Sequence, residues 1–279
     1  MKSAAYSARR TVADGIEVAE LTDAAHGVEV SIAPSLGNMA YEIKAAGKNI
    51  LWFPYHSPAG FASDPRLCGV PFLAPWANRI DGDAYWVNGR RHPRMMAQFP
   101  FAHTIAMTYR LASGELEVET VLDNHSAEPM PVAIGYHPYF QLHDSPRDQW
   151  KVHLAAREHL VLSGELIPTG ERKPVEFADP HPLHAGALDD VFGGLVRGPD
   201  GRAQFWVEGE KQRITVTYGP KYPVAVVYAP PAREIVCFEP MAAVTNGFNL
   251  AHAGVFPELQ SIPPGGQWKE SFWIRPSGF

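Results

Sequence analysis

Apolar and polar residues alternate with a period of two along much of the chain. Residues 26–33 and 115–123 show the alternation most clearly, with Val, Ile or Leu on one face and mostly Glu or Ser on the other. Alternation with one charged face is typical of antiparallel strands that are half exposed to solvent. Shorter runs rich in β-forming residues at 204–208, 213–218, 224–229 and 268–274 predict further strands.

Turn signals separate these runs. Asn88 and Gly89 lie between the strand-like residues 85–87 and 90–91, which predicts a tight hairpin. We find no long amphipathic helix and no repeat at a fixed period, and residues 163–186, rich in Pro, Gly and His, are interpreted as a long loop over one rim of a sheet. The expected fold is all-β, a large antiparallel sandwich or barrel.

Composition narrows the class of protein. The 279 residues are 46% hydrophobic, enough for a large core, and an all-β chain of this length often forms one domain, here expected over 1–279. The net charge of −6 without a basic patch argues against nucleic acid as a partner. No apolar run reaches transmembrane length and the first 14 residues lack a signal-peptide pattern, so we expect a cytoplasmic protein without a membrane partner. Cys68 and Cys237 are expected to be buried thiols.

The stretch 134–142 contains the first candidate for chemistry. His137 titrates near neutral pH, Pro138 favours an extended backbone before it, and Gly135 permits a close approach of backbone or a bulge. Tyr and Phe residues flank His137 on both sides, and aromatic rings beside a polar group suit a ring-shaped ligand. The alternative is a core histidine satisfied by one hydrogen bond.

Two further stretches offer ligand-binding groups. Asn78 and Arg79 stand together in an apolar segment and can hold sugar hydroxyls or a carboxylate, unless Arg79 pairs with a nearby acid. Asp189 and Asp190 precede an apolar pair, and one of them could accept hydrogen bonds from vicinal hydroxyls; the alternative is a solvated turn.

Glu239 ends an apolar strand and alternates with Ile235 and Cys237. We therefore expect its carboxyl group to be at least partly buried. Burial without a partner costs free energy and tends to raise the pKa of a carboxyl group. The alternative to a catalytic role is a structural salt bridge with an arginine.

Taken together, the motifs Asn78-Arg79-Ile80, His137-Pro-Tyr-Phe140, Asp189-Asp-Val-Phe192 and Glu239-Pro240 resemble those of the aldose 1-epimerases, or galactose mutarotases, in order and context. The resemblance extends from about Leu36 to the last strand. It implies a large antiparallel β-supersandwich, no metal and no cofactor. It also implies a small-molecule sugar substrate whose α and β anomers interconvert through ring opening.

The same resemblance implies a role for each candidate residue. His137 is similar to the general acid that protonates the ring oxygen, and Glu239 to the general base that takes the proton from the C1 hydroxyl. Asn78, Arg79 and Asp189 match the residues that bind the sugar. With near-normal pKa values, His137 and Glu239 would give a bell-shaped pH dependence. A sugar-binding protein without turnover, a hexose-phosphate mutarotase and a glycosidase remain alternatives.

One motif of the family is missing. Its members carry a second active-site histidine in a Leu-His-Gly stretch, which this sequence lacks, and neither His92 nor His103 has the matching context. We therefore predict that a block is absent between about Gly89 and Met96, either deleted or hidden as a gap in the chain. Deletion would favour the non-catalytic alternative.

Overall fold

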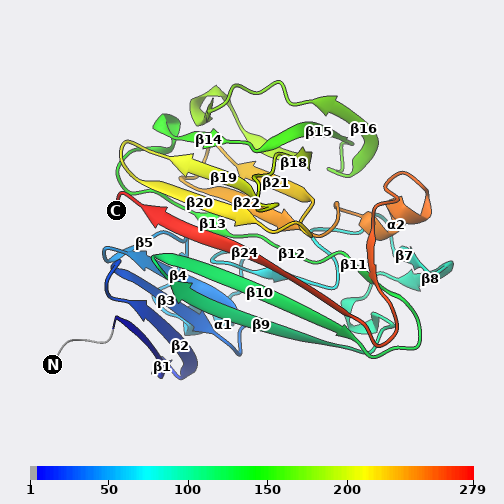
Figure 1. The fold of residues 1–279 in the computed structure, drawn as a ribbon, viewed down its shortest axis with the longest axis horizontal. Coiled ribbons are helices and arrows are strands. Elements are labelled where there is room, and N and C mark those ends of the chain that lie inside the picture. Colours follow the sequence, from blue (N-terminus) through cyan, green and yellow to red (C-terminus); the bar gives the residue numbers. More distant parts are fainter. Residues whose placement is uncertain (1–4) are drawn as a thin grey trace.

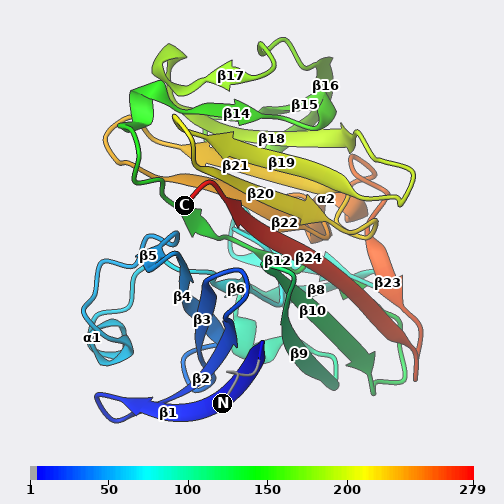
Figure 2. The ribbon, with the colours of Figure 1, turned by 60° about the vertical axis from the view of Figure 1, so that its left-hand side comes forward.

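The computed structural model describes residues 5–279, and its regular structure is mainly β-strand (Figures 1 and 2). The predicted strands are confirmed: 213–218 and 224–229 coincide with β20 (Arg213–Tyr218) and β21 (Val224–Ala229), and 115–123 lies within β10 (Glu115–Asn124). The predicted hairpin joins β7 (Ala84–Val87) to β8 (Arg90–Pro93). Its two turn residues both have positive φ, 49° at Asn88 and 73° at Gly89, as a tight hairpin turn requires.

Within residues 5–279 the paired strands form three large antiparallel sheets and two two-stranded ribbons. The five-stranded sheet consists of β1 (Tyr6–Ala13), β2 (Ile16–Asp23), β3 (Val28–Ala33), β4 (Met39–Ala45) and β5 (Lys48–Asn49). The seven-stranded sheet has the order β17 (His181–Pro182), β14 (Lys151–His153), β19 (Ala203–Glu208), β20, β24 (Gln267–Ser277), β10 and β9 (His103–Ala112). The eight-stranded sheet has the order β16 (Pro168–Pro174), β15 (Ala156–Leu162), β18 (Leu188–Leu195), β21, β22 (Val236–Met241), β12 (Gly135–Tyr136) and β6 (Phe72–Leu73), with β13 (Tyr139–Phe140) also paired to β22. The ribbons are β7 with β8 and β11 (Met130–Val132) with β23 (Gln260–Ile262).

The seven- and eight-stranded sheets pack face to face. Phe205 of β19 lies 6.2 Å from Phe238 of β22, and Tyr136 of β12 lies 4.7 Å from Phe272 of β24, measured between ring centroids. All four rings are fully buried. The five-stranded sheet lies beside β9 and β10 in both views (Figures 1 and 2). The expectation of a large antiparallel sandwich is therefore confirmed.

Since side chains alternate along a strand, the inward direction of Phe238 turns its neighbour Glu239 to the opposite face of β22. Glu239 there has Cys237 on one side and Met241 on the other, both fully buried. The expected burial of Glu239 is confirmed, with 1% of its surface exposed. The candidate site thus lies on the outer face of the eight-stranded sheet.

The interpretation of residues 163–186 as one long loop is wrong. The segment contains the strands β16 and β17 and a single 3-10 turn, Leu183–Ala185. Strand β16 is the edge of its sheet, and all of its residues after Pro168 are exposed. An edge strand with charged residues on both faces carries no apolar alternation, so its sequence resembles a loop.

Helices contribute little to the described residues. They are α1 (Pro58–Ser63), α2 (Gly247–His252) and 3-10 turns of three residues each, two of them at Met96–Gln98 and Arg147–Gln149. In the part of the chain that the structure describes, no helix is both long and apolar enough to cross a membrane. Cys68 and Cys237 are free and fully buried, as expected, and burial raises the pKa of the Cys68 thiol to about 12.

Candidate active site

Strand register brings His137 and Glu239 together. Gly135, two positions before His137, pairs with Met241, two positions after Glu239 on the antiparallel strand β22. Tyr139, two positions after His137, pairs with Cys237, two positions before Glu239. The same register carried through the intervening residues places His137 opposite Glu239, and residues opposite one another in an antiparallel pair share a face. Strand pairing in the sheet thus brings together two residues that are far apart in the sequence.

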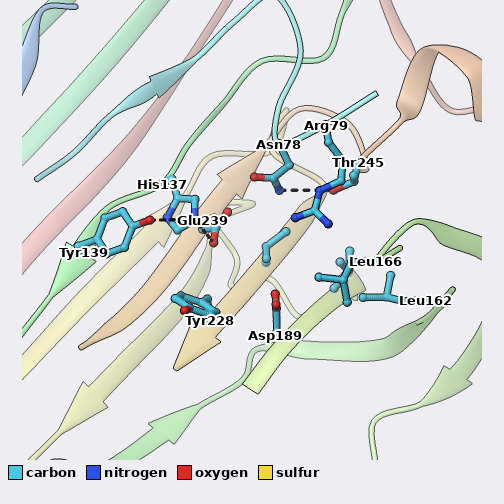
Figure 3. A pocket seen from close by; sticks show the side chains of 12 residues that line it. Asn78, Arg79, His137, Tyr139, Leu162, Leu166, Asp189, Tyr228, Glu239 and Thr245 are labelled. Carbon is cyan, nitrogen blue, oxygen red and sulfur yellow. Dashed lines mark hydrogen bonds and ion pairs between the residues drawn. The ribbon is translucent and has the colours of Figure 1, made fainter. Parts of the chain in front are cut away.

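The two side chains are in direct contact. His137 Nε2 lies 3.1 Å from Glu239 Oε1, with 13% of the His137 side chain and 1% of the Glu239 side chain exposed. The ring of Tyr139 stacks on the imidazole at 4.6 Å between centroids, and its hydroxyl lies 3.4 Å from Nε2 (Figure 3). The two candidate proton-transfer groups therefore lie side by side, and the stacked ring of Tyr139 holds the imidazole in its orientation.

Burial shifts the pKa values of the pair in opposite directions. Loss of water lowers the pKa of His137 to about 4. Loss of water also raises the pKa of Glu239 well above its usual range, and the charge of Asp189 adds to this. The nearby amide group of Asn78 and the charge of Arg79 oppose the rise without cancelling it. The expectation of near-normal pKa values is therefore wrong, because burial favours the uncharged form of both groups.

The pair lies in the wall of a cavity of about 260 Å³. Cavities that bind drug-sized ligands usually measure about 300–1,000 Å³, so this one suits a small molecule. Its floor crosses three adjacent strands, because Glu239 on β22 is opposite Val226 on β21, which is opposite Val191 on β18. The remaining lining residues are Asn78, Arg79, His137, Tyr139, Leu162, Leu166, Asp189, Tyr228 and Thr245. All five residues that the sequence singled out as site candidates therefore line one cavity.

Asn78 and Arg79 reach the cavity from the loop after β6. Asn78 adopts a positive φ of 58°, a conformation that asparagine tolerates better than most residues, and its amide Nδ2 lies 3.4 Å from Thr245 Oγ1. Arg79 donates from Nη1 to the carbonyl oxygen of Glu165 at 3.0 Å. The guanidinium points into the cavity (Figure 3). Arg79 makes no ion pair with a carboxylate in the described residues, so the structural alternative for it fails.

Adjacent aspartates on β18 face different surroundings. Asp189 is exposed at the cavity, where partial loss of water raises its pKa and the charge of Arg79 opposes the rise. Asp190 is not among the cavity residues, and its Oδ1 lies 2.8 Å from His159 Nε2. The two residues are part of a strand, so the alternative of a solvated turn is wrong. Alternation along the strand turns the Asp189 carboxylate to the cavity and the Asp190 carboxylate to His159.

His137 is the one histidine that lines the cavity among residues 5–279. His92 stacks on Tyr85 with 5.5 Å between ring centroids, and the Nδ1 of His103 lies 2.7 Å from the carbonyl oxygen of Phe101. Neither replaces the histidine that the sequence lacks.

The stretch from Gly89 to Met96 shows no break. Strand β8 is followed by Arg94, whose backbone N–H donates to the carbonyl oxygen of Asp83 at 2.8 Å, and by the 3-10 turn Met96–Gln98. The prediction of a gap hidden in this stretch is therefore wrong. The connection is short and direct, and it contributes no side chain to the cavity.

Sequence reasoning missed several cavity residues. Tyr228 belongs to a correctly predicted strand, but only the pairing of β21 with β22 shows that it stands beside His137, at 6.4 Å between ring centroids. Leu162 and Leu166 flank a turn that no motif marks. Within residues 5–279, no three His, Cys, Asp or Glu side chains form a group that could hold a metal ion.

Known proteins share the sequence family and the fold of this chain. The model of the family described as aldose 1-epimerase matches residues 91–275, which includes His137, Asp189 and Glu239 but not Asn78 or Arg79. A galactose mutarotase-like protein from Clostridium acetobutylicum has the same fold, with a TM-score of 0.84, 17% identity and coverage of 98% of this chain and 99% of its own. An aldose epimerase homologue from C. elegans gives 0.72 at 17% identity, covering 91% of this chain and 96% of its own. Galactose 1-epimerase from Lactobacillus acidophilus gives 0.65 at 12% identity, covering 98% and 99%. At these identities the structural matches establish the fold.

Proposed function

The chain belongs to the aldose 1-epimerase family, and we propose that it interconverts the α and β anomers of a free aldohexose by acid–base-catalysed opening and closing of the sugar ring. The observation that carries the proposal is the contact between His137 Nε2 and Glu239 Oε1 in the wall of a monosaccharide-sized cavity. Both groups can exchange a proton, and both open onto the place where a sugar would lie.

The reaction is a balanced exchange of protons. One group takes the proton of the C1 hydroxyl while the other gives a proton to the ring oxygen, the bond between C1 and the ring oxygen breaks, and C1 becomes an aldehyde. Rotation about the C1–C2 bond turns the other face of the aldehyde to the ring hydroxyl. The reverse proton transfers then close the ring as the other anomer, and the protein returns to its starting state.

The pair needs one proton for this exchange, whichever atom carries it. Between the two apparent pKa values of a coupled pair, one proton is shared by the two groups. Transfer of that proton from Glu239 to His137 turns the uncharged pair into an imidazolium and a carboxylate. In that form His137 is the acid toward the ring oxygen and Glu239 the base toward the C1 hydroxyl.

Asn78, Arg79 and Asp189 would hold the sugar in register with the pair. Asp189 accepts hydrogen bonds from hydroxyl groups, and the guanidinium of Arg79 donates them. Burial raises the pKa of Asp189 and the positive charge of Arg79 opposes that rise, so the two side chains are close enough to act on one ligand. Hydrogen bonds to Arg79 and Asp189 would therefore orient a sugar that carries no charge of its own.

Within residues 5–279 no second histidine lines the cavity, which favours one rival, a sugar-binding protein without turnover. A hexose-phosphate mutarotase is less well supported, because Arg79 is the one basic residue lining the cavity in the described chain apart from His137. A phosphate would need more positive charge than a single arginine that already donates to a carbonyl oxygen.

Polarimetry of freshly dissolved α-D-glucose and α-D-galactose, with and without the protein, tests the proposal. We expect faster mutarotation of at least one sugar, and its loss in His137→Asn and Glu239→Gln. Calorimetric titration of the same sugars separates the rival. Sugar binding without any acceleration would establish the non-catalytic protein instead.

A further inference from the structure

Leu166 has an unusual backbone for its residue type. Its φ is +60°, in the left-handed region that disfavours side chains with a Cβ. The other non-glycine residues with positive φ in residues 5–279 are Asp, Asn, Ser and Ala, all smaller or able to bond locally. Residues held in such a conformation cluster at ligand-binding positions, where the surrounding structure imposes it. Leu166 is at such a position, since its side chain lines the cavity.

The turn that carries Leu166 is held by its own hydrogen bonds. Ser163 donates its backbone N–H to the carbonyl oxygen of Ile167 at 2.8 Å and accepts the N–H of Leu166 at 3.0 Å. The Ser163 hydroxyl also accepts the N–H groups of Glu165 and Ile167 at 3.2 and 3.3 Å. Arg79 ties the turn to the cavity through its 3.0 Å bond to the carbonyl oxygen of Glu165. The turn is therefore a fixed part of the cavity wall.

Leu166 stands at the end of the cavity away from the reacting pair. Figure 3 shows Leu162 and Leu166 on one side and His137, Tyr139 and Glu239 on the other. The sheet explains the separation: Glu239 is on β22, and Leu162 ends β15, three strands away in the order β15-β18-β21-β22. At about 4.8 Å between neighbouring strands, the two backbones are about 14 Å apart.

In a pyranose ring the C4 position is opposite C1. A sugar with C1 and its ring oxygen at His137 and Glu239 therefore turns C4 toward the wall formed by Leu162 and Leu166. The side chains of Leu162 and Leu166 offer neither a hydrogen-bond donor nor a charge to a larger substituent, and the nearby Arg79 already donates to the carbonyl oxygen of Glu165. Resting on the proposed function, we propose that Leu166 determines specificity by closing the cavity behind C4, so that free monosaccharides are accepted and sugars carrying a second sugar on O4 are excluded.

The test compares α-D-glucose with the 1,4-linked disaccharide β-maltose by polarimetry. In the wild-type protein we expect kcat/KM for glucose to exceed that for maltose by more than about tenfold, the least that a misfitting group in an apolar pocket costs. Leu166→Gly removes the side chain and suits the positive φ, so the turn keeps its conformation. This variant should reduce the preference for glucose by about tenfold or more.

Two control variants distinguish the effect of the Leu166 side chain on the preference from the effect of its backbone conformation. Leu166→Ala shortens the side chain without favouring the left-handed backbone, so it should shift the preference in the same direction. Ala46→Gly places glycine at another positive φ, 47°, in the turn between β4 and β5, and should leave the preference unchanged. A wild type equally active on both sugars, or an unchanged preference in both Leu166 variants, would overturn the inference alone. A wild type that accelerates neither glucose nor galactose would overturn the proposed function and the inference with it.

Discussion

Replacing Glu239 by Gln should abolish most activity while making the protein more stable. The substitution keeps the size of a side chain that is 1% exposed and removes its ability to take a proton. A positioned general base typically contributes about 10²- to 10⁴-fold to rate, so kcat should fall by that factor. The imidazole keeps its neighbours, because Tyr139 still stacks on it.

The gain in stability follows from the raised pKa of Glu239. The folded protein keeps this carboxyl group protonated at pH values where the unfolded chain, with a pKa near 4.5, has released the proton. The contribution of Glu239 to stability is therefore fully present below pH 4.5 and is lost as pH rises toward the folded-state pKa. Each pH unit in that window lowers the free energy of unfolding by about 1.4 kcal/mol relative to Glu239→Gln.

Urea denaturation of both proteins at several pH values between 4 and 8 measures this difference. The two curves of unfolding free energy should agree near pH 4 and separate as pH rises, with the variant above the wild type. Polarimetry on the same preparations measures the loss of activity. Parallel curves would show that Glu239 is not protonated in the folded protein, and an unchanged rate would reject it as the base.

Three further predictions follow from the geometry. The profile of kcat/KM against pH should fall in acid near the lowered His137 pKa of about 4 and stay flat through pH 6.5, because the pair keeps its single proton there. A fall centred near pH 6.5 would contradict the shared-proton mechanism. Asp189→Asn should lower kcat/KM in the polarimetric assay by about 10- to 100-fold, the equivalent of a charged hydrogen bond worth about 1.5–3 kcal/mol. Asp190→Asn should lower kcat/KM less, because Asp190 bonds to His159 outside the cavity. Gly135→Ala should lower the free energy of unfolding in urea by about 1–3 kcal/mol, since the added methyl group would overlap the buried sulfur of Met241. Gly164→Ala has open space around it and should have little effect, so equal stability of the two variants would refute the packing argument.

Local patterns in the sequence determined the fold class. Period-two alternation predicted β10, and the runs of β-forming residues predicted β20 and β21, because the side-chain pattern of a half-buried strand is written in consecutive residues. The Asn88-Gly89 turn was predictable for the same reason, since the backbone conformation it needs depends on those two residues. Edge strand β16 escaped prediction because exposure on both faces leaves no pattern to find.

Sequence motifs also marked His137, Glu239, Asn78, Arg79 and Asp189 as a set, but their arrangement depended on the sheet. Pairing between β12, β13 and β22 put His137 opposite Glu239, at a place where both side chains are largely removed from water. The pKa values then moved apart, against the near-normal values expected from the residue types. Ionisation depends on the solvent and charges around a group, and strand pairing between distant segments sets both. The position of Leu166 in the cavity wall also depends on how distant segments pack together, so only the structure revealed it.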